Sequence, residues 1–141
     1  MPFKLAEVNY LAVLVAGFVA FLVGGAWYTA LFGKLWVKLH GYSEEKVKQM
    51  RANMKPARFF GGMVVSYLVL AVVMAILLTG FSQPTALTGV ALGALLWLGP
   101  ASTIGMTAHL ASDKPIGIYL IDVGCQLVYL LLMGVLLGAW R

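Results

Sequence analysis

The chain has 141 residues, of which 62% are hydrophobic and 11% are charged, and its mean hydropathy is +0.93. Soluble domains carry about 45–50% apolar and about 25% charged residues, and a short soluble chain cannot bury so much apolar surface. The net charge of +5 does not indicate a nucleic-acid-binding protein, because seven of the ten basic residues lie in one segment between apolar runs. These features exclude an ordinary soluble domain and predict a single transmembrane domain over residues 1–141.

Four segments are long and apolar enough to cross a bilayer, which takes about 20 residues of helix. They are residues 11–32, 59–81, 86–109 and 116–140, and Asp122 is the one carboxylate within them. Helices satisfy their own backbone polar groups in hydrocarbon, and the segments show no strand-like alternation. The predicted fold class is therefore all-α, an integral membrane bundle of four transmembrane helices.

The first segment, residues 11–32, has an alternative interpretation as a cleaved signal peptide, with Lys4 ahead of it and Ala30 as the cleavage residue. It exceeds the 7–15 residues of a usual signal-peptide core, and Tyr28 is too large for the −3 position. We therefore expect it to remain as the first span.

The basic residues between the first two spans set the orientation. The loop of residues 33–58 holds seven of them, the loop of residues 81–85 none and the loop of residues 109–115 only Lys114. Loops rich in lysine and arginine stay in the cytoplasm. We expect the first and third loops to be cytoplasmic and both termini to lie on the exterior side.

The first loop also contains a helix signal. Ser43 can cap a helix whose first turn carries Glu44 and Glu45, and Val47 and Met50 continue an apolar stripe. The pattern predicts a short amphipathic cytoplasmic helix resting on the inner leaflet, with a partner-binding helix as the alternative. The residues expected to contact lipid headgroups are Lys46, Lys48, Arg51, Lys55 and Arg58.

Several short elements together resemble a known family. They are Gly25–Tyr28, Phe32–Trp36 and Gly41–Glu45, with Asn9 ahead of the first span and Ile121-Asp122 in the fourth. Along essentially the whole chain the sequence is similar to the bacterial domain-of-unknown-function family 1761. The resemblance implies a small four-span protein of the bacterial inner membrane and brings no assigned activity with it.

Small residues recur at four-residue spacing in every span, which permits close approach of helix backbones. The stripes are Ala16-Ala20-Gly24, Gly62-Ser66, Ala71-Ala75, Gly89-Gly93 and Gly134-Gly138. More of them are present than one bundle needs, so we expect homo-oligomers.

In the third span Gly99-Pro100 predicts a kink, because proline lacks the amide N–H and clashes with the preceding turn. The kink could be static or a hinge.

Asp122 is the leading candidate for a site, because a charge at bilayer depth costs at least about 2.5–3.5 kcal/mol and is usually paired or functional. Tyr119, Gln126 and Tyr129 share its helix face, which should therefore turn toward other helices. His109, at the end of the third span, is the natural candidate partner, although Asp113 and Lys114 compete for it.

The other polar residues of the spans gather in the cytoplasmic half, among them Ser66, Thr107 and Tyr28. This distribution allows a polar cavity open to the cytoplasm, with Trp27 and Tyr28 at its mouth. It equally allows a closed hydrogen-bond network that locks the bundle.

No catalytic motif, nucleotide-binding loop or complete metal site is present, and we expect no cofactor. Cys125 is the single cysteine, and one histidine with one aspartate does not make a zinc site.

The favoured function is that of a transport-related, accessory or lipid-contacting subunit that forms homo-oligomers, with membrane lipids and a small hydrophobic ligand as partners. One alternative is a membrane-embedded enzyme that acts on a lipid or small hydrophobic molecule through Asp122 and His109. Another is a scaffold that recruits a partner through residues 34–58.

Overall fold

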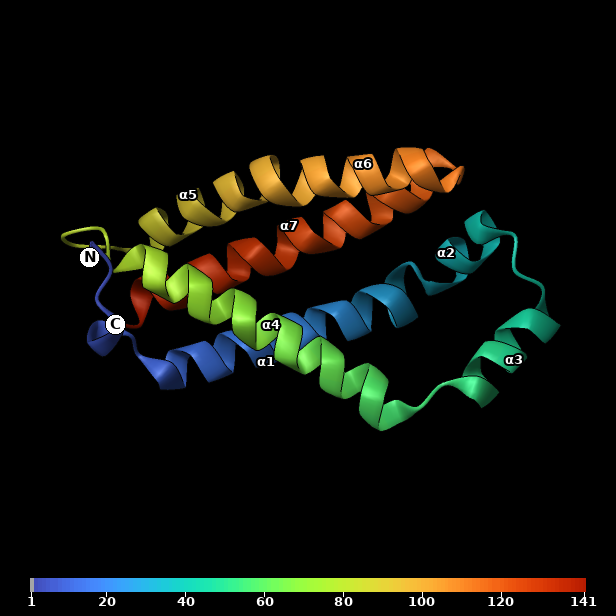
Figure 1. The fold of residues 1–141 in the computed structure, drawn as a ribbon, viewed down its shortest axis with the longest axis horizontal. Helices are drawn as coiled ribbons and strands as arrows, with labels where there is room; N and C mark the ends of the chain where they lie inside the picture. The colour runs from blue at the N-terminus through green and yellow to red at the C-terminus, as the bar shows by residue number, and fades with distance from the viewer. Residues whose placement is uncertain (1) are drawn as a thin grey trace.

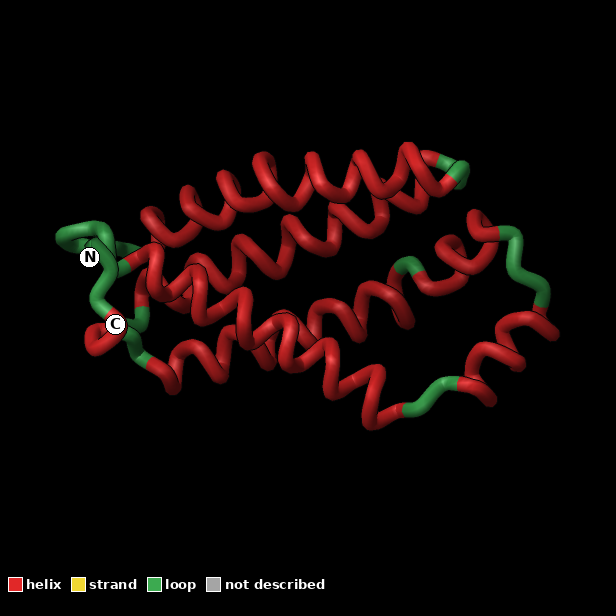
Figure 2. The backbone as a smooth tube through the Cα atoms, in the orientation of Figure 1, coloured by secondary structure: helices red, strands yellow, loops and turns green. Residues whose placement is uncertain are grey.

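The computed structural model describes residues 2–141, and that part of the chain is helical with no strand (Figures 1 and 2). Four helical segments are long and apolar enough to cross a membrane: Tyr10–Leu31, Pro56–Leu78, Ala86–Ser112 and Ile116–Ala139. The prediction of an all-α bundle of four transmembrane helices is confirmed. In chain order the elements are the 3-10 helix η1 (Leu5–Glu7), α1 (Tyr10–Ala26), the π-helical turn η2 (Trp27–Leu31), α2 (Gly33–His40), α3 (Glu44–Asn53), α4 (Pro56–Leu78), α5 (Ala86–Leu96), the π-helical turn η3 (Trp97–Ala101), α6 (Ser102–Ser112) and α7 (Ile116–Ala139).

Helix boundaries follow from local chemistry. The side chains of Asn9 and Ser43 each accept a hydrogen bond of 3.1 Å from the backbone N–H three residues on, which caps α1 and α3. Gly41, with φ of 73°, ends α2, and Asp113, with φ of 53°, ends α6. The helix predicted in the first loop is therefore present as α3.

The second span, α4, begins and ends three residues earlier than expected from hydropathy. Pro56 occupies its first turn, where the missing amide N–H costs nothing, so the helix starts before the apolar run does. The third span continues to Ser112 instead of ending at residue 109, because no helix-breaking residue precedes Asp113.

The bundle has two distinct ends (Figure 1). Both termini and the link between α4 and α5 lie at one, here called the terminal end. The helices α2 and α3 and the turn between α6 and α7 lie at the other, here called the basic end. Four spans return the chain to the end at which it started.

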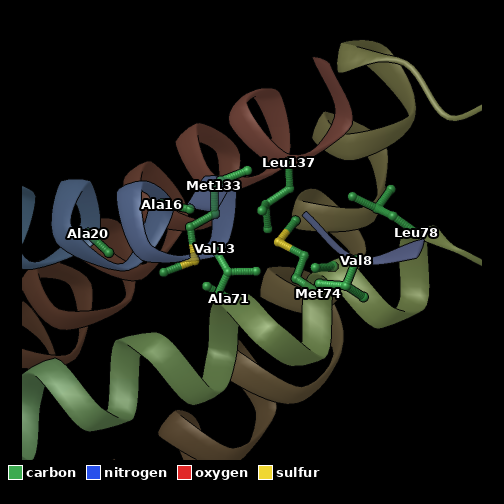
Figure 3. Packing of buried hydrophobic residues seen from close by; sticks show 11 residues of the cluster. Val8, Val13, Ala16, Ala20, Ala71, Met74, Leu78, Met133 and Leu137 are labelled. Atoms are coloured by element: carbon green, nitrogen blue, oxygen red, sulfur yellow. The ribbon is translucent and has the colours of Figure 1, made fainter. Parts of the chain in front are cut away.

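The tightest core lies toward the terminal end, where α1, α4 and α7 meet (Figure 3). Ala16 and Ala20 of α1 are fully buried and let Met74 of α4 and Met133 of α7 fill the space between the helices. Alanine on one helix opposite methionine on the others suits a core of irregular gaps.

Glycines bring α5 and α7 into backbone contact. A Cβ on Gly89 would overlap the carbonyl oxygen of Gly134, one on Gly93 would overlap that of Leu130, and one on Gly138 would overlap that of Thr85. These positions therefore require glycine for steric reasons.

The first half of α4 is more exposed than the second half, although Phe60 still packs edge-on against Phe21 of α1. Every residue from 51 to 62 is exposed, and burial in α4 begins only at Ala71. The basic end is therefore more open than the terminal end.

Candidate functional site

The intramembrane carboxylate is held by the first span. The Tyr28 hydroxyl donates a hydrogen bond of 2.5 Å to Oδ1 of Asp122, and both side chains are half-buried. Tyr28 lies in η2, the π-helical turn that ends the first span, where a widened turn shifts its side chain relative to a regular helix. Hydrogen bonds to ionised acceptors are short and strong, so this contact orients the carboxylate.

Two tryptophans fix the backbone on either side of Asp122. Trp27, the first residue of η2, donates its indole N–H to the carbonyl of Ile121 at 2.9 Å. Trp97, the first residue of η3, donates to the carbonyl of Val123 at 2.8 Å. Each π-helical turn therefore begins with a tryptophan bonded to α7, and Asp122 lies between the two acceptors. Such turns are frequent at functional sites.

Pro100 accounts for the second of these turns. It lies inside η3 and supplies no amide donor, so the regular hydrogen-bond ladder of the third span is interrupted there. The hydroxyl of Ser102 then donates to the carbonyls of Trp97 and Leu98, at 2.6 Å and 2.9 Å. The expected kink is thus a π-helical turn whose carbonyls are satisfied locally.

Asp122 opens onto a pocket of about 370 Å³ at the basic end, between α2, α6 and α7. The carboxylate is the one acidic group among its lining residues. The Tyr119 hydroxyl bonds the carbonyl of Ser102 at 2.9 Å, which ties the pocket wall to the third span. The polar and aromatic lining consists of Trp36, His40, His109, Ser112, Lys114, Tyr119, Asp122 and Gln126.

Two groups on the pocket wall have polar atoms without partners. The indole N–H of Trp36 and both ring nitrogens of His40 are hidden from solvent, and within residues 2–141 none of them makes a hydrogen bond. Buried polar atoms are nearly always paired, so an unpaired set indicates water or a ligand. Because Trp36 and His40 both line this pocket, it is the strongest candidate binding site in the part of the chain described.

The same two residues belong to an aromatic array that runs from Asp122 toward the basic end. The Trp36 ring lies 6.2 Å from Tyr28 and 4.1 Å from His40, and His40 stacks on Tyr42 at 4.9 Å. The Lys114 ammonium lies 5.8 Å from the Tyr42 ring, within cation–π range. This array attaches α2 to the bundle and gives the pocket an aromatic wall.

His40 lies outside the spans, at the end of α2. Burial lowers the pKa of its imidazole below the ordinary value, the Lys114 ammonium lowers it further, and the Asp122 carboxylate opposes both effects. His40 is therefore neutral at pH 7, with one ring nitrogen free to accept and the other to donate.

Three of the residues expected to join Asp122 do line its pocket: His109, Tyr119 and Gln126. However, within the described part of the chain no hydrogen bond or ion pair joins His109 to Asp122. The His109 ring lies 5.7 Å from the ring of Tyr119, a residue of the same helix face as Asp122. His109 lies in the last turn of α6, and the residue of α7 that its ring faces there is Tyr119 and not Asp122.

The other expected site residues are spread over separate places. Tyr129 packs edge-on against Tyr67, with ring centroids 5.2 Å apart, and Trp27 supports the α7 backbone without lining the pocket. Thr107 and Ser66 are exposed and donate their hydroxyl hydrogens to carbonyls of their own helices. Neither Thr107 nor Ser66 lines the Asp122 pocket.

The basic residues also divide into two groups. Lys46, Lys48 and Arg51 are exposed on α3. Lys55 and Arg58 instead line a groove of about 690 Å³ at the start of α4, together with Ser66 and Tyr67. This groove is separate from the Asp122 pocket, and the two share no lining residue.

Sequence reasoning missed Trp36, His40 and Trp97. Trp36 and His40 are four residues apart, a spacing that places them on one helix face, so the pair could have been recognised. Trp97 precedes the Gly99-Pro100 pair that predicts the kink, but nothing in the sequence links its indole to Val123. As for metals, no three His, Cys, Asp or Glu side chains gather anywhere between residues 2 and 141.

Together these features define a small multi-pass membrane protein with a polar pocket beside a single intramembrane carboxylate. The chain belongs to the family described as "Protein of unknown function (DUF1761)", which it matches over residues 11–138. The resemblance seen in the sequence is therefore confirmed. No curated protein and no solved structure matches the chain significantly.

Proposed function

We propose that this protein is a transport-related subunit of the bacterial inner membrane that binds a small organic cation at Asp122. The observation that carries the proposal is the pocket of about 370 Å³, which is lined by the intramembrane carboxylate together with Trp36 and His40, two residues whose ring nitrogens have no partner within residues 2–141. A charged residue inside a membrane is by default a candidate for a substrate or proton site.

The lining supports a cation with N–H donors as the ligand. One oxygen of Asp122 accepts from Tyr28, which leaves the second oxygen to accept from a ligand. The rings of Trp36 and Tyr119 provide π faces for a positive charge. Neutral His40 offers one acceptor nitrogen to a donor of the same ligand. A small molecule with an apolar body fits the remaining apolar wall.

The proposal includes an orientation and an assembly. The basic end, which carries α2 and α3, faces the cytoplasm, and both termini face the exterior, in accord with the distribution of lysine and arginine. The pocket then opens to the cytoplasm. The chain works as a homo-oligomer, because the spans carry more stripes of small residues than the contacts of one bundle need.

Binding can be tested with guanidinium as the cationic probe and acetate as the anionic one. The protein carries four tryptophans, so fluorine labelling of the indoles gives four resonances in nanodiscs, and Trp36→Phe identifies the one in the pocket. Guanidinium should shift the Trp36 resonance and leave that of Trp140 in place, and Asp122→Asn should abolish the shift. An equal response to acetate, or an unchanged response in Asp122→Asn, would refute the cation site.

Transport is tested separately in proteoliposomes that contain a pH-sensitive dye. A guanidinium gradient should drive proton movement with the wild-type protein and none with Asp122→Asn, if the carboxylate exchanges a proton for the cation. Binding without any flux would leave a cation site and contradict the transport role.

A further inference from the structure

A second site lies at the start of α4, away from Asp122. The groove of about 690 Å³ is formed by the α3–α4 link and the first three turns of α4. Its upper part carries Lys55 and Arg58, and its lower part carries Gly62, Met63 and Tyr67. The groove is therefore cationic at one end and mainly apolar at the other.

The two cations at the top are free to meet an anion. The one ion pair within residues 2–141 joins Lys4 to Glu7, so neither Lys55 nor Arg58 has a carboxylate partner there. No acidic residue lines the groove. The first turn of α4 adds to the positive potential, because the partial positive charge of its helix dipole lies there and Lys55 supplies no side-chain cap.

The depth of the groove matches a lipid lying along the span. Arg58 is the third residue of α4, which places it at headgroup level, and Tyr67 lies nine residues further on. Nine residues of helix rise about 13 Å, which is most of one leaflet of a hydrocarbon core about 30 Å thick. A headgroup at Lys55 and Arg58 would therefore bring an acyl chain past Met63 to Tyr67.

The surface below the cations is shaped for such a chain. A Cβ on Gly62 would meet no atom within 4 Å, so the groove is open at this position and the helix surface is flat. The Ser66 hydroxyl bonds the Gly62 carbonyl in its own helix, so it needs no partner from a bound molecule. Below the two cations the groove is therefore lined mainly by apolar surface.

We propose that this groove binds one anionic glycerophospholipid of the surrounding bilayer, with its phosphate at Lys55 and Arg58 and one acyl chain along Gly62, Met63 and Tyr67. Basic pockets beside transmembrane helices recognise anionic headgroups by this combination of charge and depth. The site is independent of the cation proposed at Asp122.

The test is native mass spectrometry of the full chain titrated with phosphatidylglycerol, and with phosphatidylcholine of the same acyl chains. The double variant Lys55→Gln/Arg58→Gln removes the headgroup contacts. The matched control Lys46→Gln/Lys48→Gln removes the same charge from α3, outside the groove. Gly62→Leu keeps the charges and fills the acyl-chain position. All of these positions are exposed, so the variants should fold.

We expect phosphatidylglycerol to be retained more strongly than phosphatidylcholine. A basic residue at an anionic surface contributes about a factor of five, so the groove double variant should lower retention about 25-fold. Gly62→Leu should also lower it, and the α3 control should change it about twofold at most. Equal retention of the two lipids, or equal losses in the groove and control variants, would overturn the site. A Gly62→Leu variant that keeps its lipid but changes oligomeric state would also overturn it, because a second copy would then occupy the groove.

Discussion

The Tyr28 hydroxyl and the Asp122 carboxylate, 94 residues apart in the chain, form a hydrogen bond of 2.5 Å that joins the first span to the fourth. The bond orients the one carboxylate found inside the spans. It also places one end of the aromatic array of Trp36 and His40 next to that charge. The same pair of residues therefore joins two spans and orients the carboxylate of the candidate site.

Removing the Tyr28 hydroxyl should destabilise the bundle without abolishing its fold. Tyr28→Phe leaves a carboxylate oxygen without its donor, which should cost about 1.5–3 kcal/mol in the free energy of unfolding. Unfolding by a denaturing detergent in mixed micelles measures this change. A double-mutant cycle with Asp122→Ala should give a coupling free energy of about 1 kcal/mol or more.

The control for this prediction is Tyr129→Phe. Tyr129 packs against Tyr67, but its hydroxyl makes no hydrogen bond within the described residues, so the loss should be smaller. If Tyr28→Phe and Tyr129→Phe were equally stable and the cycle showed no coupling, the bond would have no energetic role.

The indoles of Trp27 and Trp97 should each stabilise the bundle through their bonds to α7. Trp27→Phe and Trp97→Phe retain an aromatic ring and lose the N–H donor, which should cost about 1 kcal/mol each. Trp140→Phe is the matched control, because Trp140 is 39% exposed at the end of the chain. The same denaturant titration applies, and losses no larger than that of Trp140→Phe would contradict the prediction.

The contact between α5 and α7 should tolerate no side chain larger than hydrogen. Gly89→Ala or Gly134→Ala would drive a methyl group into the facing backbone, which cannot move aside as a flexible side chain could. We expect a loss of about 3 kcal/mol or more, seen as a lower yield of monodisperse protein and a lower melting temperature.

Gly61→Ala provides the comparison for these glycines, because a Cβ there would meet no atom within 4 Å. Alanine favours helix by about 1 kcal/mol over glycine, so this variant should be neutral or slightly stabilising. If Gly61→Ala destabilised the protein and Gly89→Ala did not, the close contact of α5 with α7 and the open surface of α4 at Gly61 would both be contradicted.

Acid should weaken the attachment of α2 through His40. Burial and Lys114 lower the pKa of His40 in the folded state, so below the ordinary value of about 6.5 the unfolded chain takes up a proton that the folded chain does not. Stability should therefore fall as the pH drops below about 6.5, down to the lowered pKa. Melting temperatures between pH 7.5 and 5.5 should fall further for the wild type than for His40→Asn, and parallel slopes would contradict this role.

Some features followed from the sequence because their causes are local. Four apolar stretches predict four spans, since hydrocarbon imposes the same demand on every residue it surrounds. Ser43 ahead of Glu44 predicted the start of α3, since a cap acts within one turn. Asp122 stood out as a candidate site for the same kind of reason, because the cost of a buried charge belongs to the residue itself.

The partners of that charge were decided only by the tertiary structure. His109 was nearest along the hairpin of the third and fourth spans, yet Tyr28 makes the bond, because η2 turns the end of the first span toward α7. The roles of Trp36 and His40 likewise depend on how α2 folds back against α7. Which helix faces meet, and at what depth, depends on packing between segments that are distant in the chain. A local pattern of residues therefore cannot determine these contacts.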